Sequence, residues 1–285
     1  MAAEAGKPKL GIIAGGGTLP LRVADACTAA HRPHVLFAIQ GEADAPVERQ
    51  AVAVLPIGAF GAAIEQLKAQ GCGEVLFVGK VGWPDFSAIK LDWGGIKLLP
   101  KLIAAKTQGD DAVLRVMGAA FEAEGMRLVG VDDVAESLVA PAGSLGALTP
   151  DETACADLAK AVAVIAALGP FNVGQGAVVC DGIVLAVEAA EGTDEMLGRC
   201  AHLPDSFRGT EASRRGVLVK MPKPGQERRI DLPTIGLATI EGAAAAGLAG
   251  VAIAAGGALV LDREAVAARA DALGLFVYGF TKDKA

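Results

Sequence analysis

The sequence is poor in the residues that build common zinc and redox sites. It has three histidines and five widely spaced cysteines, with no C-x-x-C pair and no H-E-x-x-H motif. A zinc site with nitrogen and sulfur ligands is therefore not expected, and any metal should be bound by oxygen atoms. The cysteines sit mostly in apolar surroundings, which predicts reduced core residues in a cytoplasmic protein.

Aromatic residues and clustered positive charge are also scarce. Aromatic residues make up 4% of the chain, the net charge is −7, and the lysines and arginines are scattered. Surfaces that bind nucleic acid combine basic patches with stacking aromatic side chains, so no nucleic acid partner is expected. The first residues lack a basic start followed by a long apolar core, so no signal peptide is expected and a cytoplasmic location is predicted.

One long stretch almost without charge, residues 232–261, superficially resembles a membrane span because Glu241 is its only charged residue. A span needs about 20 consecutive apolar residues. Pro233 and many glycines interrupt this stretch. The pattern instead predicts a helix at 240–247 and strands at 250–254 and 258–261.

The first half of the chain alternates short apolar runs with helical patterns. Alternation of this kind predicts parallel strands joined by crossover helices, hence an α/β fold with an N-terminal Rossmann-like sheet over residues 1–139. The predicted strands are 9–14, 34–39, 51–57, 74–78 and 126–131, and the predicted helices are 19–30, 61–70, 96–106 and 110–124.

The second half is predicted to be a separate mixed α/β domain, residues 151–285. Residues 140–150 combine Pro, Gly, Ser and Thr without periodicity, so they are interpreted as a linker. Two apolar runs flank Asp181-Gly182, a dipeptide typical of a tight β-hairpin.

Two features of the first half are candidates for anion binding. The loop Gly15-Gly16-Gly17-Thr18 joins a strand to a helix, where backbone N–H groups can hold a phosphate. It is neither G-x-G-x-x-G nor a Walker A loop, and an ordinary turn explains its glycines equally well. Lys80 follows a buried strand and would emerge at the carboxyl edge of the sheet, where it either contacts phosphate or is simply solvated.

Four carboxylates surround the predicted hairpin and the start of the next helix: Asp181, Glu188, Glu191 and Asp194. Carboxylate oxygens suit magnesium or manganese. Asp181 is interpreted as a turn residue, and Glu188 and Glu191 as functional. The alternative for Glu191 and Asp194 is that they charge a helix N-terminus.

The densest polar segment is KMPKPGQERRIDLPTIG at residues 220–236, where cations stand beside carboxylates without regular periodicity. A phosphoryl-transfer site needs cations for the anionic oxygens and a carboxylate for a metal or a water. A charged surface loop is the alternative that composition alone favours equally.

Three ordered motifs resemble the LpxI family of UDP-2,3-diacylglucosamine pyrophosphatases. They are LGIIAGGGTLP at 10–20, GQGAVVCDGIVLAVEAAEGTD at 174–194, and K-x-P-K-P-x-Q-x-x-R-x-D-L-P-T-I-G at 220–236. The resemblance implies hydrolysis of UDP-2,3-diacylglucosamine to UMP and 2,3-diacylglucosamine 1-phosphate (lipid X) in lipid A biosynthesis, with Mg²⁺ or Mn²⁺. It also implies two domains with the glycolipid in a cleft between them.

The resemblance further implies site residues. Asp231 is the catalytic candidate, as a metal ligand or as the carboxylate that orients water, while Gln226, Lys220 and Lys223 would hold the pyrophosphate. With Glu188 and Glu191, which the residue pattern singles out, Asp231 makes up the predicted metal ligands. Together with Lys80, the predicted substrate contacts are Ala14, Gly15, Thr18, Pro20, Thr234 and Gly236.

The strongest alternative is a non-catalytic nucleotide or sugar-nucleotide binding protein. Against it, and against a nicotinamide-dependent oxidoreductase, Gln40 stands where a Rossmann strand would end in an acidic ribose-binding residue. Another lipid A enzyme, such as an acyltransferase, is a third reading. A homodimer is compatible with this class. Contact with the inner membrane is expected to be transient and peripheral, since the sequence suggests neither a span nor a basic amphipathic helix.

Overall fold

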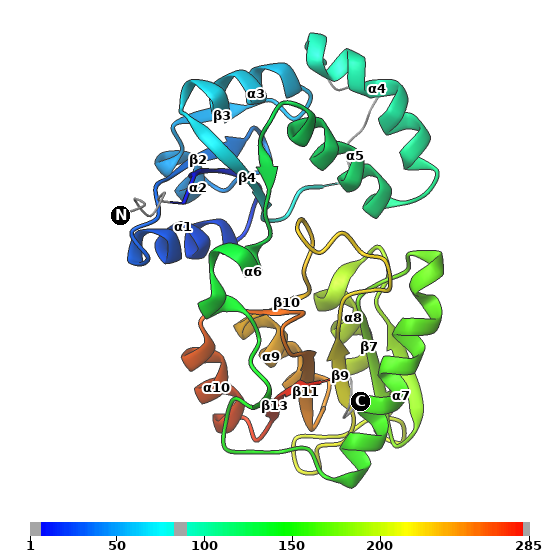
Figure 1. Cartoon of the computed structure of the whole chain (residues 1–285). Coiled ribbons are helices and arrows are strands. Elements are labelled where there is room, and N and C mark those ends of the chain that lie inside the picture. The colour runs from blue at the N-terminus through cyan, green and yellow to red at the C-terminus, as the bar shows by residue number, and fades with distance from the viewer. Residues whose placement is uncertain (1–6, 83–89, 282–285) are drawn as a thin grey trace. The chain divides into compact units, whose positions relative to one another are not determined.

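The computed structural model describes residues 7–82 and 90–281. The chain divides into two compact units, Met1–Ser137 with Arg229–Asp231, and Leu138–Arg228 with Leu232–Ala285 (Figure 1). Residues 140–150, interpreted as a linker, belong to the second unit. Gly143–Ser144 forms strand β6 there, because even a loop rich in glycine and proline can add a short edge strand to a sheet.

The first unit contains a parallel five-stranded sheet in the order β3-β2-β1-β4-β5. This is the strand order with which a doubly wound sheet begins. The central strand β1 is buried on both faces, as its continuous apolar run requires. The strands are β1 (Lys9–Ala14), β2 (His34–Ile39), β3 (Ala53–Leu55), β4 (Cys72–Val78) and β5 (Arg127–Leu128).

Helices cover this sheet and extend beyond it. On one face, Phe37 and Phe77 pack with Leu67 of α3 and Phe121 of α5. Helix α4 packs instead on α5, through a separate cluster that includes Leu98. The helices of this unit are α1 (Leu19–Ala29), α2 (Ala45–Gln50), α3 (Phe60–Ala69), α4 (Trp93–Lys106), α5 (Asp110–Ala123) and α6 (Val131–Val134).

The second unit contains a mixed six-stranded sheet in the order β6-β13-β11-β9-β7-β8, and a two-stranded parallel sheet, β10-β12. Strands β9, β11 and β13 are parallel, while β6, β7 and β8 pair antiparallel to their neighbours. The bounds are β7 (Gly176–Cys180), β8 (Ile183–Val187), β9 (Val217–Lys220), β10 (Thr234–Ile235), β11 (Gly250–Ala254), β12 (Leu259–Val260) and β13 (Phe276–Phe280).

Helices lie on both faces of the larger sheet. Val217 and Val219 face α7, whereas Leu218 faces the cluster built by α8, α9 and α10, as the two-residue period of a strand requires. The helices of this unit are α7 (Glu152–Leu168), α8 (Gly192–Ala201), α9 (Leu237–Ala245) and α10 (Arg263–Ala272). A short 3₁₀ turn, Gly169–Phe171, follows α7, and another, Glu136–Leu138, lies at the boundary between the two units.

The predicted α/β fold, with a parallel sheet in the first half and a mixed sheet in the second, is confirmed, and so is the hairpin. Strands β7 and β8 pair antiparallel, and both turn residues, Asp181 and Gly182, have positive φ angles. Residues 232–261 fold as β10, α9, β11 and β12, which agrees with the prediction of a helix and strands instead of a membrane span.

A different stretch, Glu152–Phe171, is the helix among the described residues that is long and apolar enough to cross a membrane. Length and composition alone are weak evidence, since the core helix of a globular unit passes the same test. Here Leu158 and Ile165 pack on the sheet, and Asp157 is buried beside the hairpin turn. The packing indicates a core helix of the second unit.

Four of the five cysteines are buried free thiols, as predicted. Cys155 is exposed instead, because it lies on the side of α7 that faces away from the sheet. Burial, together with the nearby Asp181 carboxylate, raises the pKa of Cys180 to about 11.

Candidate functional site

The glycine loop of the first unit lies against the loop that follows β4. Gly15 donates its N–H to the carbonyl of Val78 at 2.9 Å, and Gly16 and Lys80 exchange two backbone hydrogen bonds of 2.8 Å. A Cβ on Gly15 would lie 2.3 Å from the Lys80 carbonyl oxygen. Glycine is therefore required here by the close approach of two backbones.

The third N–H of the loop is bound by a carboxylate. Gly17 donates to Asp44 Oδ2 at 2.7 Å, and Glu42 Oε2 accepts from the N–H of Gly82 at 2.7 Å. The loop's first three N–H groups are thus used within the protein, which favours the turn interpretation. An incoming phosphate would have to displace the Asp44 carboxylate.

The predicted contacts at this edge come together but differ in what they can offer a ligand. Ala14 and Pro20 are buried, whereas the side chains of Thr18 and Lys80 are exposed. Thr18 precedes α1 without capping it through its hydroxyl. Of the predicted contacts at this edge, Thr18 and Lys80 therefore have side chains that are open to a ligand.

In the second unit, three polar side chains form a buried chain at the ends of β8 and β9, which we call the Lys220 cluster: Glu188, Thr193 and Lys220. Lys220 Nζ donates to Thr193 Oγ1 at 2.6 Å, and Thr193 Oγ1 donates to Glu188 Oε1 at 2.7 Å. The ammonium and the carboxylate lie 3.8 Å apart, and both side chains are almost fully buried. Thr193 thus bridges a buried ion pair.

The second oxygen of Glu188 is buried and has no hydrogen-bond partner among the residues described. A Cβ on Gly176 would lie 2.8 Å from this oxygen, so the glycine makes room for it. A buried carboxylate is costly unless it is paired and hydrogen-bonded, and here only half of its capacity is met. Glu188 Oε2 is therefore suited to accept a hydrogen bond or to bind a cation.

Lys223 and Gln226 shape the loop after β9. Gln226 Oε1 accepts the backbone N–H of Lys223 at 2.7 Å, and Lys223 Nζ donates to Asn172 Oδ1. Both side chains are buried, at 5% and 8% exposure. The loop is thus held by its own polar side chains and by Asn172, which fixes where Lys223 lies.

Thr234 and Gly236 flank the same region. The carbonyl of Thr234 accepts from Lys220 Nζ at 3.4 Å, while its hydroxyl donates to the carbonyl of Leu232 at 3.1 Å. Gly236 is the N-cap residue of α9. The structure therefore brings Thr234 to Lys220 through its backbone.

Asp231 belongs to the segment Arg229–Asp231 of the first unit. Arg229 forms an ion pair with Glu122 of α5 at 2.7 Å, and Ile230 packs on the core beside Leu128. These contacts anchor the segment. They fix the backbone that carries the predicted catalytic carboxylate.

The three predicted metal ligands are not assembled within one unit. Glu188 is in the second unit, as is Glu191, which forms an ion pair with Arg199. A hydrogen bond from its own backbone N–H, with Arg199, holds the pKa of Glu191 below its ordinary value. In the described ranges, no three His, Cys, Asp or Glu side chains gather as a metal site.

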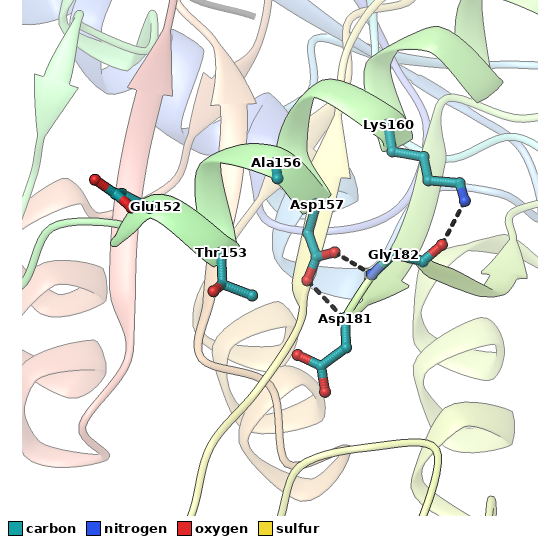
Figure 2. A pocket seen from close by; sticks show the side chains of 7 residues that line it. All are labelled: Glu152, Thr153, Ala156, Asp157, Lys160, Asp181 and Gly182. Atoms are coloured by element: carbon teal, nitrogen blue, oxygen red, sulfur yellow. Dashed lines mark hydrogen bonds between the residues drawn. The ribbon is translucent and has the colours of Figure 1, made fainter.

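A surface hollow beside α7 is explained by a structural contact. Asp157, 1% exposed, accepts the N–H groups of Asp181 and Gly182 at 3.0 and 2.7 Å, and Lys160 donates to the Gly182 carbonyl (Figure 2). These residues clamp the hairpin turn. The Lys220 cluster lies at the other end of the same strands, roughly 15 Å away at ~3.3 Å per residue.

The sequence did not single out Thr193 or Asn172. Thr193 lies in the motif EGTD, which includes the residue but indicates no role for it. Only the fold brings Thr193 to Lys220, 27 positions away. Asn172 follows a 3₁₀ turn and has a positive φ of 52°, a conformation that asparagine tolerates.

Comparisons with known proteins cover both units. The family model of the LpxI N-terminal domain matches residues 9–138, and that of the LpxI C-terminal domain matches residues 141–278. The UDP-2,3-diacylglucosamine pyrophosphatase LpxI of Caulobacter vibrioides is 51% identical over 271 residues. That alignment covers 95% of this chain and 97% of the relative.

Proposed function

The chain belongs to the LpxI family, and on that premise we propose that it hydrolyses the pyrophosphate of UDP-2,3-diacylglucosamine. The products are UMP and 2,3-diacylglucosamine 1-phosphate, a step of lipid A biosynthesis. The observation that carries the proposal is the match, along nearly the whole of both chains, to a relative that is named for this activity.

Lys220 binds the pyrophosphate in this proposal. An ammonium has three donors, and those of Lys220 towards Thr193 and the Thr234 carbonyl account for two, which leaves one for a phosphate oxygen. A cation fixed in a buried site stabilises negative charge that develops during phosphoryl transfer more strongly than one in water. Thr193 is the positioning residue that holds this ammonium in place.

Lys223 supplies a second positive charge to the pyrophosphate. Asn172 and the Gln226 amide fix the loop that carries it, so little side-chain entropy is lost when the substrate binds. Gln226 acts on the substrate through this loop as well as through its own amide. Thr18, Lys80 and the remaining predicted contacts complete the proposed substrate site.

Asp231 is the proposed catalytic carboxylate, which orients the attacking water or binds the metal. A buried oxygen without a hydrogen-bond partner, Glu188 Oε2, is the donor in the second unit that best fits Mg²⁺ or Mn²⁺. Mg²⁺ is commonly held by one or two carboxylates together with substrate phosphates, so a preformed cluster of three is not needed. The metal would neutralise charge on the pyrophosphate oxygens.

The same activity predicts where the enzyme works. A substrate with two acyl chains resides in a bilayer, so we propose a cytoplasmic enzyme in transient contact with the inner membrane.

Turnover of detergent-dispersed UDP-2,3-diacylglucosamine by the purified chain tests the proposal. We expect Asp231→Asn to lower UMP release by roughly a hundredfold or more while the protein stays folded. UMP release by this variant close to that of the unaltered enzyme would refute the role of Asp231. Label from ¹⁸O water, found either in UMP or in the sugar 1-phosphate, identifies which phosphorus is attacked.

A further inference from the structure

The outer face of helix α4 exposes large apolar side chains. Trp93 is 77% exposed, Ile96 49% and Ile103 55%. Pro100 is exposed between them, so the four residues follow the i, i+3, i+7, i+10 spacing that places them on one side of a helix. We call these four residues the α4 stripe.

The stripe is not the edge of a core. The opposite side of α4 packs on α5, where Leu98 and Leu102 contact a cluster that includes Val113. The start of the helix is fixed by Asp92, which accepts the N–H groups of Gly95 and, from α3, Ala62, both at 2.8 Å. Helix α4 is therefore held by its inner face, and its outer apolar face is left without a partner among the described residues.

Positive charge accompanies the stripe. The charged residues of α4 are Lys97, Lys101 and Lys106, all exposed, and Lys90 precedes the helix. The helix contains no acidic residue, in a chain whose net charge is −7. Lys97 and Lys101 each follow a stripe residue directly, so they lie beside the apolar side chains.

This combination fits an anionic lipid surface. A helix that lies in a membrane interface has an exposed apolar face flanked by lysines, and tryptophan favours the boundary between water and lipid. A second copy of the chain fits less well, because a two-fold contact through this face would bring the same lysines together.

We propose that the α4 stripe docks the protein on an anionic membrane surface. The inference rests on the proposed function, since a substrate with two acyl chains must be taken from a bilayer. It also corrects the expectation that the chain has no basic amphipathic helix. The amphipathic character of α4 was not evident from the sequence, because the helix has apolar residues on its packed inner face as well as on its exposed face.

Flotation of the full chain with vesicles tests the proposal. The vesicles are phosphatidylcholine alone, or phosphatidylcholine mixed with phosphatidylglycerol. We expect binding to the mixed vesicles that salt weakens, because lysines near an anionic surface contribute an attraction that salt screens. Two variants should each bind the mixed vesicles at least roughly tenfold more weakly than the unaltered chain. They are the triple variant Trp93→Ser, Ile96→Ser, Ile103→Ser and the double variant Lys97→Gln, Lys101→Gln.

Phe171→Ser is the matched control, because Phe171 is also 77% exposed but lies in the second unit, and it should bind vesicles like the unaltered chain. The triple variant should still hydrolyse detergent-dispersed substrate normally, which separates failure of docking from failure of the proposed function. Three results would overturn the proposal: no binding to mixed vesicles, unchanged binding by both variants, or a dimer in solution that the triple variant abolishes.

Discussion

Thr193 offers the sharpest test of how the buried cluster works. Replacing it by valine preserves the shape of the side chain but removes the hydroxyl that accepts from Lys220 at 2.6 Å and donates to Glu188 at 2.7 Å. Two buried charged groups would each lose a hydrogen bond. The substitution therefore perturbs the cluster with little change in packing volume.

The expected magnitude follows from the geometry. A buried polar group left unsatisfied costs about 1–3 kcal/mol. Lys220 and Glu188, 3.8 Å apart, can move towards each other and recover part of the loss, so we expect a net destabilisation of about 2 kcal/mol. For a unit of this size that corresponds to a fall of roughly 6 °C in the melting temperature.

In the proposed site, the same movement would draw the Lys220 ammonium away from the pyrophosphate. A displacement of ~1 Å at a catalytic group can cost about a hundredfold in rate, so kcat should fall roughly ten- to a hundredfold and KM should change less. Thr193→Ser keeps the hydroxyl and should restore most of kcat. The assays are UMP release at varied substrate concentration and thermal unfolding of both variants.

Either of two outcomes would contradict the proposed role of the Thr193 hydroxyl. One is a valine variant with unchanged kcat, which would mean that Lys220 does not depend on the bridge. The other is a serine variant as impaired as the valine variant, which would mean that the methyl group rather than the hydroxyl matters.

Three further predictions concern other parts of the chain. Asp157→Ala removes both hydrogen bonds to the hairpin turn and should cost about 2 kcal/mol in urea unfolding with little effect on kcat; unchanged stability would contradict the clamp. At pH 8 a thiol reagent should modify Cys155 alone in the folded protein, since Cys180 is buried and has a pKa of about 11; fast labelling of Cys180 would contradict this. Burial opposes ionisation of Asp92, but hydrogen bonds from backbone N–H groups outweigh the effect of burial and lower the pKa of this carboxyl. The contribution of the Asp92 carboxylate to folding stability is therefore present above its unfolded pKa and is lost as the pH falls through its folded pKa. Asp92→Ala should therefore cost about 1 kcal/mol near neutral pH and progressively less in acid, as measured by denaturant unfolding at several pH values.

Local pattern was enough to predict most elements of the fold. Strands 9–14, 34–39 and 250–254 were predicted with the observed bounds, because continuous apolar runs between turn residues are typical of buried parallel strands. The hairpin at Asp181-Gly182 followed from turn chemistry. Composition did not predict the two-residue strand β6 within residues 140–150, because this strand depends on pairing with β13, which is distant in the sequence.

The site could be predicted only in part, since motifs name residues but not their contacts. Lys220 and Glu188 were both predicted, but their pairing through Thr193 depends on how β8, β9 and α8 meet. At the glycine loop, by contrast, the sequence suggested a function that the fold does not favour. Its sequence allows a phosphate cradle, whereas the fold directs its N–H groups to other parts of the protein, including the carboxylate of Asp44.

The proposed hydrolysis is tested most directly by the product stoichiometry of the purified chain acting on UDP-2,3-diacylglucosamine, first with Mg²⁺ and then with a chelator. We expect equal amounts of UMP and 2,3-diacylglucosamine 1-phosphate with Mg²⁺, and little of either once the metal is removed. Folded protein that releases neither product from detergent-dispersed substrate in the presence of Mg²⁺ would contradict the proposed hydrolysis.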